Sequence, residues 1–483
     1  MKKIKSLKFN MVLNAIKSIM EIIFPLITFP YASKVLGVDN IGKYNFCASI
    51  ISYFVMLSEL GTVTYAIREG AAMRTESNKL NNFVSQMFSM RVYFMILSCI
   101  FLFVLIAFNP TCFNNRVILY IMSLNIIFNT IGVDWIFSIF EDYSYITVIS
   151  IILRIFSVIL LFVFVRKPSD IIIYTVVGIS SKVVGGIINF LKAKKYCKIT
   201  FTLNVDWRKH FKPILILFGM NIAISIYVSL DTTMLGFLCD DYTVGIYTVS
   251  SKIYSIVKTL LSSILVVSIP RLSSLLKNDD KLIFSSTAEK IYKMLLTVLM
   301  PSIFGVFLLK RQIIFLISSK EFITATSSLS ILCMALLFCM GSWFWAQCVL
   351  IPLRKEKDVL WITVVSAIVN LILNFILIPF GKENAAAFTT LISEGISFIL
   401  CRFIAKKNLI SFKIKSIMGK IIIGCLGIFV LYYFINKIIT NDIAFVCVMI
   451  SFSVIVYFAL EIILKNEAIG EWTEIIKKKF NKC

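Results

Sequence analysis

The chain of 483 residues is poor in the groups that usually carry catalysis. It has one histidine, His210, and none of its twelve cysteines is separated from another by two residues, so neither metal-ligand nor redox spacing is present. No G-x-x-x-x-G-K-[ST] phosphate-binding loop occurs, and no stretch between hydrophobic runs is long enough for a nucleotide-binding domain. These absences argue against a metalloenzyme, a membrane acyltransferase that uses an intramembrane histidine and an ATP-driven pump. We expect no cofactor.

Acidic residues are also few, since 26 Asp and Glu face 49 Lys and Arg, for a net charge of +23. The bases lie mostly between hydrophobic runs and form no separate soluble domain, so a positive-inside topology is favoured over nucleic-acid binding. The basic clusters fall at the two ends and in the even-numbered loops, which predicts cytoplasmic N- and C-termini. Glu141 and Asp142 break this pattern. Arg91 and Lys293 lie close to the cytoplasmic ends of their spans and could simply snorkel to the membrane surface.

Hydrophobic residues make up 59% of the chain and are grouped in about fourteen runs. Each run has about 20 residues or more, the length that a helix needs to cross the hydrocarbon core of a bilayer. The sequence therefore predicts an all-α, polytopic membrane protein of about fourteen transmembrane helices.

A weak internal repeat divides these runs. Leu36-Gly37 and Gly42 recur about 200 residues later as Leu235-Gly236 and Gly245, and a second pair of short matches has a similar offset. The repeat predicts two six-helix lobes with pseudo-symmetry, a common plan of transporters, followed by two more helices. The expected parts are an N-terminal lobe at 1–200, a C-terminal lobe at 201–410, and two additional helices with a basic cytoplasmic tail at 411–483.

Four cations lie near the middle of predicted spans: Lys17, Arg154, Lys182 and Lys258. A cation at bilayer depth costs at least about 2.5 kcal/mol on insertion scales unless it is paired or faces water. Several such residues predict a polar cavity inside the membrane, and their charge indicates an anionic solute.

The cation of the first span has an acid nearby. Asn14, Lys17 and Glu21 recur at spacings of three and four residues, which places them on one helical stripe. Lys17 and Glu21 can pair across one turn, so they either neutralise each other for insertion or line a cavity. Asn221 lies on a matching polar stripe of the seventh span.

Two of the other cations have no acid on their own helix face. Ser255 and Lys258 share a stripe of the eighth span, so the partner of Lys258 must come from another helix, from water or from a ligand. Arg154 either lines the cavity or pairs with an acid such as Glu59 or Glu394.

An ordered series of short segments resembles one family, the bacterial O-antigen and capsule repeat-unit flippases of the Wzx type. The segments are Phe-Pro-Tyr-Ala-Ser-Lys-Val-Leu-Gly at 29–37, Asn-Ile-Gly-Lys-Tyr at 40–44, Asp-Trp-Ile-Phe at 134–137, Ile351-Pro352, Asn-Leu-Ile-Leu-Asn at 370–374 and Glu394. They cover most of residues 1–404. Gly-Lys-Glu-Asn-Ala-Ala at 381–386 departs from the Gly-Ala pair that is usual in the family, which affects the local turn.

The resemblance implies a member of the multidrug/oligosaccharidyl-lipid/polysaccharide exporter superfamily in the bacterial inner membrane, and no enzyme. Its cargo would be an undecaprenyl-diphosphate-linked oligosaccharide for O-antigen or capsular polysaccharide, moved by alternating access. The four buried cations would contact the diphosphate or acidic sugars, and Glu21, Glu59 and Glu394 would serve gating or coupling, with a proton or sodium gradient as a possible energy source. Polysaccharide polymerase machinery is a possible partner.

Three alternatives remain open. A cation-coupled multidrug exporter would prefer a cavity rich in acids. A polysaccharide polymerase or ligase usually has a large external catalytic loop, whereas the inter-span stretches here are short. A structural scaffold would not explain buried cations.

Overall fold

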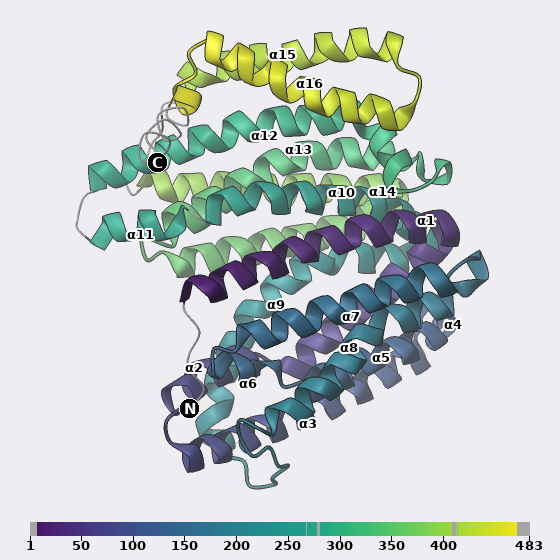
Figure 1. Cartoon of the computed structure of the whole chain (residues 1–483), viewed down its shortest axis with the longest axis vertical. Helices are drawn as coiled ribbons and strands as arrows, with labels where there is room; N and C mark the ends of the chain where they lie inside the picture. The colour runs from purple at the N-terminus through teal and green to yellow at the C-terminus, as the bar shows by residue number, and fades with distance from the viewer. Residues whose placement is uncertain (1–6, 267, 278–280, 408–411, 413, 471–483) are drawn as a thin grey trace. The chain divides into compact units, whose positions relative to one another are not determined.

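The chain folds into a bundle of long helices in the computed structural model, which describes the backbone of residues 7–266, 268–277, 281–407, 412 and 414–470 (Figure 1). Side chains are described there except at 7–19, 21, 22, 220–228, 264 and 277. The regular elements of the described part are all helices, with no strand among them, which confirms the all-α prediction. Ten of its helices are long and apolar enough to cross a membrane.

The first half of the chain contains α1 (Leu7–Glu59), α2 (Thr62–Ala72), α3 (Ser77–Phe108), α4 (Pro110–Asn114), α5 (Arg116–Ile131), α6 (Asp134–Ile139), α7 (Tyr143–Phe164), η1 (Pro168–Asp170), α8 (Ile171–Ala193) and α9 (Trp207–Leu238). The second half contains α10 (Asp241–Val266), α11 (Ile269–Lys277), α12 (Lys281–Ile317), η2 (Lys320–Phe322), α13 (Ala325–Trp343), the π-helix η3 (Phe344–Leu350), α14 (Glu356–Lys407), α15 (Lys415–Ile438) and α16 (Asp442–Ile463).

Two of these elements, α1 and α14, each consist of two helices joined by a sharp turn. A straight helix of 53 residues would be ~80 Å long, but α1 breaks at Gly37, where φ is 76°, and Figure 1 shows it folding back. In the same way α14 breaks at Lys382, where φ is 46°. With both counted as two, the described residues hold fourteen long helices, the number predicted from the hydrophobic runs.

The turn of α14 produces a tight antiparallel hairpin. Across it, Nδ2 of Asn370 donates to the hydroxyl of Ser393 (3.5 Å), and the hydroxyl of Thr389 donates to Oδ1 of Asn374. Asn374 is fully buried, so the amide groups of this hairpin bond across the helices, as polar residues do inside membranes.

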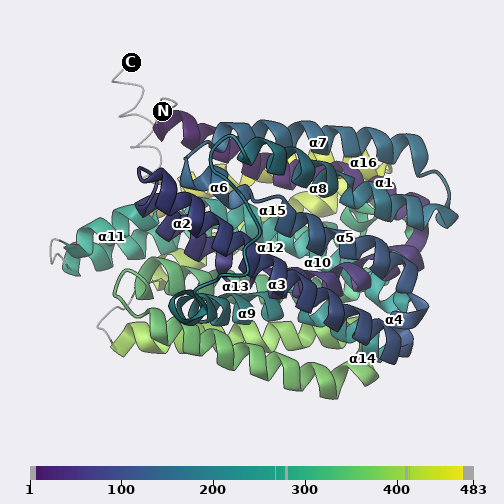
Figure 2. The same cartoon turned by 90° about the horizontal axis from the view of Figure 1, so that it is seen from below.

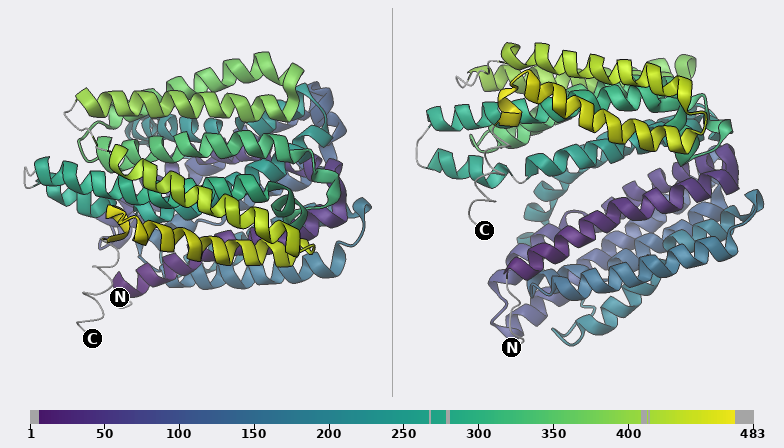
Figure 3. Two further views of the ribbon diagram at one scale, coloured as in Figure 1. Left: turned by 90° about the horizontal axis from the view of Figure 1, so that it is seen from above. Right: turned by 45° about the horizontal axis from the view of Figure 1, so that its top comes forward.

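The helices form two compact units, Met1–Gly245 and Ile246–Cys483. The division falls later than the boundary expected near residue 200, because α9 packs against α1 and α2. The region from 411 onward is not set apart, since α15 and α16 pack on each other and on α12 within the second unit (Figure 3). The arrangement of six-helix lobes stays a prediction, and residues 471–483 of the expected tail lie outside the described residues.

In the first unit, the two glycines of the sequence repeat allow two backbone segments to approach closely. Each glycine lies against the backbone of the segment that carries the other. A Cβ atom added to Gly42 would lie 1.8 Å from the carbonyl oxygen of Asp241, and one added to Gly245 would lie 2.3 Å from that of Val38. Only glycine permits so close an approach of two backbones.

In the second unit, charges tie the chain after α16 to α12. Nζ of Lys293 lies 2.8 Å from Oε2 of Glu467 and 3.0 Å from Oε1 of Glu289. The stem of Lys293 is thus largely buried, with its side chain 12% exposed, while its ammonium bonds Glu467, whose side chain is 57% exposed. Snorkelling of Lys293 stays a prediction.

Candidate functional site

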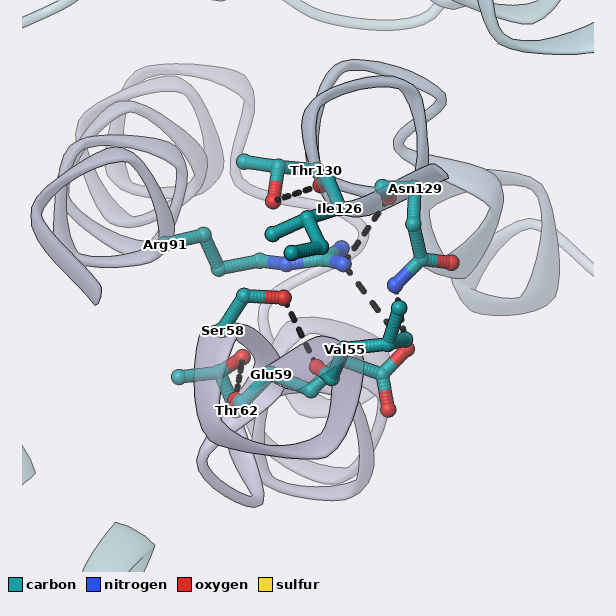
Figure 4. A network of polar contacts seen from close by, with 8 residues as sticks. All are labelled: Val55, Ser58, Glu59, Thr62, Arg91, Ile126, Asn129 and Thr130. Atoms are coloured by element: carbon teal, nitrogen blue, oxygen red, sulfur yellow. Dashed lines mark hydrogen bonds and ion pairs between the residues drawn. The ribbon is translucent and has the colours of Figure 1, made fainter. Parts of the chain in front are cut away.

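A buried arginine organises the polar interior of the first unit (Figure 4). Nη2 of Arg91, on α3, donates to the carbonyl oxygen of Asn129 on α5 (3.0 Å) and lies 4.0 Å from Oε1 of Glu59. Nδ2 of Asn129 donates to the same Glu59 oxygen at 2.8 Å. Arg91 is 2% exposed, so the expectation that it snorkels to the surface was wrong. Its guanidinium finds two acceptors inside the bundle.

The end of α1 determines where Glu59 points. Leu60 and Gly61 both have positive φ values, 43° and 75°, so the helix stops at Glu59 and α2 begins at Thr62. Asn129 comes from the last turn of α5, close to the end of that helix at Ile131. Two helix ends therefore bring the carboxylate and the amide together beside Arg91.

A second acid lies on the same side of α5. Val133 has φ 44° and separates α5 from α6, which opens with Asp134. Nδ2 of Asn189, on α8, donates to Oδ1 of Asp134 at 2.6 Å. Asn189 is 6% exposed, and its Oδ1 has no partner among the described residues.

These groups line a cavity of about 250 Å³ between α5, α7 and α8. Its polar lining includes Asn129, Asp134, Asn189 and the two cations Arg154 and Lys182. Figure 2 shows α7 and α8 lying side by side. Glu59 and Arg154 both lie within electrostatic reach of Lys182. Arg154 and Lys182 thus line one polar cavity, and their role in binding stays a prediction.

The second unit has its own charged cluster, around Lys258. Lys258 on α10 lies beside the thiol of Cys339 and within electrostatic reach of Glu394 on α14, and its Nζ is 5.8 Å from the ring centroid of Tyr254. The hydroxyl groups of Tyr254 and Ser342 donate to the two oxygens of Glu394, at 3.4 and 3.3 Å. Two other helices, α13 and α14, thus bring polar groups close to Lys258, and its role in binding stays a prediction.

Five predicted residues remain, of which the structure describes the side chain of Ser255. Ser255 is exposed on α10, and its carbonyl oxygen accepts from the hydroxyl of Thr259 at 2.8 Å. The side chains of Asn14, Lys17, Glu21 and Asn221 lie outside the described residues. Their roles stay predictions.

Sequence reasoning missed Arg91, Asn129 and Asp134 as members of the site. Arg91 lies in the apolar run of α3, whereas Asn129 and Asp134 both lie in the next run, which the structure divides into α5 and α6. The signal that was available is that polar residues interrupt two consecutive runs. Among the described residues, no group of three His, Cys, Asp or Glu side chains could hold a metal ion.

The fold and the cavity define a polytopic helical membrane protein that keeps charged side chains inside one helix bundle. The chain belongs to the family described as "Polysaccharide biosynthesis protein", whose model matches residues 8–276. This confirms the family-level expectation from the short segments.

Individual relatives agree with this assignment. The chain is 27% identical, over 274 residues, to a protein of Escherichia coli (strain K12) named "Putative O-antigen transporter"; the match spans 56% of this chain and 66% of the relative.

Two solved structures have the same fold. The structure titled "Lipid II flippase MurJ, inward closed conformation" superposes with a TM-score of 0.78 at 17% identity, over 95% of this chain and 99% of the other. A multidrug resistance MATE family transporter of the MOP superfamily, in an inward-facing conformation, superposes with a TM-score of 0.53 at 10% identity, over 81% of this chain and 98% of the other. These two structures show the fold of the chain, and the relative from Escherichia coli is the one named for O-antigen transport.

Proposed function

We propose that the chain is a flippase that moves undecaprenyl-diphosphate-linked oligosaccharide across the bacterial inner membrane, for O-antigen or capsular polysaccharide. The observation that carries the proposal is the cavity of the first unit, where Arg154 and Lys182 face the same space inside a bundle of apolar helices. A diphosphate brings negative charge into the membrane, and cations in a medium of low dielectric constant are suited to receive it.

Each set of side chains has a part in this proposal. Arg154 and Lys182, together with Lys17 and Lys258, contact the diphosphate or acidic sugars. The polar residues Asn14, Asn221 and Ser255 bind sugar hydroxyl groups. Glu21, Glu59 and Glu394 act in gating or in coupling to a proton or sodium gradient, while the bundle alternates between inward-open and outward-open forms with both termini in the cytoplasm. Polymerase machinery would receive the cargo.

The family and the relative named for O-antigen transport support this cargo over a drug. A cation-coupled drug exporter would place acids where cationic drugs bind. Here the bases Arg154 and Lys182 line the cavity, and one of the two nearby acids, Asp134, is already bonded to Asn189.

The test is removal of the protein from its own cells. We expect lipid-linked oligosaccharide to accumulate on the cytoplasmic face and surface polysaccharide to be lost. Arg154→Gln and Lys182→Gln should reproduce the loss at normal protein abundance. The matched control is Arg166→Gln, since Arg166 is an exposed arginine that follows α7. Intact surface polysaccharide in the deletion strain, with increased drug sensitivity, would contradict the proposal and favour a drug exporter.

A further inference from the structure

Arg154 faces two cavities rather than one. The second cavity, of about 300 Å³, lies between α1, α7 and α8 in the same unit, and its lining includes Phe24, Tyr44, Tyr174 and Ser157 besides Arg154. We propose that this pocket is a monosaccharide subsite, which holds the sugar bonded to the diphosphate while the diphosphate lies in the cavity of Lys182. The inference rests on the proposed function and adds to it how the glycan itself is recognised.

The pocket is built around two tyrosines. The ring centroids of Tyr44 and Tyr174 are 4.6 Å apart, and the ring planes are inclined at 59°. An aromatic face carries partial negative charge and attracts the C–H groups on the flat side of a sugar ring. Two faces inclined in this way form an angled wall, which suits a ring better than it suits a flexible chain.

The phenol of Tyr44 is fitted closely to α8. A Cβ atom added to Gly178 would lie 2.8 Å from the hydroxyl oxygen of Tyr44, so the glycine leaves the room that this side chain occupies. The tyrosine and serine hydroxyl groups that line the pocket can each donate and accept, as recognition of a sugar hydroxyl requires. A volume of about 300 Å³ is at the lower end of ligand pockets, which matches a single ring.

The position of Arg154 connects the two cavities chemically. Its guanidinium lies 5.9 Å from the ring centroid of Phe24 on one side, and it shares the other cavity with Lys182. A guanidinium has five N–H donors spread over a plane, so one group can contact phosphate and sugar oxygens together. In a diphosphate-linked glycan the first sugar is bonded directly to phosphate, so subsites for the two must be neighbours.

The test compares two lipids on the purified full-length protein in lipid nanodiscs. One is the lipid-linked oligosaccharide extracted from cells that lack this protein, and the other is undecaprenyl diphosphate without sugar. Wild-type protein should bind the sugar-bearing lipid more tightly. Tyr44→Leu and Tyr174→Leu should each weaken binding of the sugar-bearing lipid about three- to ten-fold, the size expected for one aromatic contact, and leave undecaprenyl diphosphate binding unchanged.

Two further variants sharpen this result. Tyr174→Phe keeps the aromatic face and should lose less than Tyr174→Leu. Arg154→Gln should weaken binding of both lipids, because Arg154 belongs to both cavities. Unchanged binding of undecaprenyl diphosphate also shows that a tyrosine variant has folded.

The outcomes separate the inference from the proposed function. If both lipids bind equally well, or if the leucine variants weaken both alike, the sugar subsite is wrong and the flippase proposal stands. If neither lipid binds wild-type protein, the proposed function fails and the subsite fails with it.

Discussion

Arg91 and Glu59 form an ion pair between α3 and the end of α1, with Nη2 and Oε1 4.0 Å apart (Figure 4). The pair is unequal, because the Arg91 side chain is 2% exposed whereas that of Glu59 is 37% exposed. Burial without a partner costs far more for the arginine than for the carboxylate.

This asymmetry predicts unequal effects of substitution. Arg91→Ala should destabilise the protein by about 2–4 kcal/mol, because it leaves a cavity and removes the donor to the carbonyl oxygen of Asn129. Glu59→Gln should cost less, since the new amide oxygen still accepts from Asn129. Thermal unfolding of the two purified variants checks the order. If both variants lost the same stability, the burial of Arg91 would not explain the effect of these substitutions.

The cluster around Lys258 predicts coupling between two helices. Lys258→Met and Glu394→Gln should each lower the free energy of unfolding, because each leaves the other charge without its counterpart. The double variant should lose less than the sum, with an interaction of about 0.5–3 kcal/mol. A double-mutant cycle from denaturant unfolding measures this value. Additive losses would show that the two side chains do not interact.

The close approach of the repeat turns predicts intolerance to a single methyl group. Gly42→Ala and Gly245→Ala should each destabilise the protein by about 1–3 kcal/mol, because the new Cβ meets a backbone carbonyl that cannot rotate away. Gly419→Ala is the control, since nothing lies within 4 Å of a Cβ at that exposed position in α15. It should be neutral or stabilise by up to about 1 kcal/mol. The melting temperatures of the three variants measure these effects. A decrease for Gly419→Ala equal to that for Gly42→Ala would contradict the packing argument.

The tether after α16 predicts a pH dependence. The Lys293 ammonium donates a hydrogen bond to Glu467 and lowers the pKa of that carboxyl below its usual value. Glu467 therefore adds stability above its unfolded-state pKa, and this contribution is lost as the pH falls through the lower folded-state pKa. Glu467→Gln should melt slightly below wild type at neutral pH, and the difference should vanish once the pH falls below the folded-state pKa of Glu467. If the difference in melting temperature grew on acidification, the pKa of Glu467 would be raised in the folded protein, which would contradict this prediction.

Much of the fold could be predicted because a bilayer constrains sequence strongly. The number of apolar runs in the sequence, fourteen, equals the number of long helices in the described residues, because a span needs both a minimum length and an apolar surface. The unit boundary at Gly245 could not be predicted, because it depends on α9 packing against α1 and α2.

The sequence predicted cations inside the bundle, but it did not predict which residues lie next to each of them. Arg154 and Lys182 stood out because a cation in mid-span is costly, and they line one cavity. The groups near Lys258 are Cys339 on α13 and Glu394 on α14, far along the chain, whereas helical periodicity reports only neighbours on the same helix. Arg91 was misjudged for a related reason, since its acceptors lie on α1 and α5.

The hairpin of α14 has a consequence for how the protein is made. Its two helices meet at Lys382 with no loop between them, and amide groups near the turn bond across the pair. Asn374, Thr389 and Ser393 also bond within their own helices, so each helix satisfies part of its polar groups alone and the pairing supplies the rest. An unpaired polar group is costly in hydrocarbon, so entry of the two helices into the bilayer as a pair is favoured. A tag placed at this turn should lower the amount of inserted protein before it lowers transport.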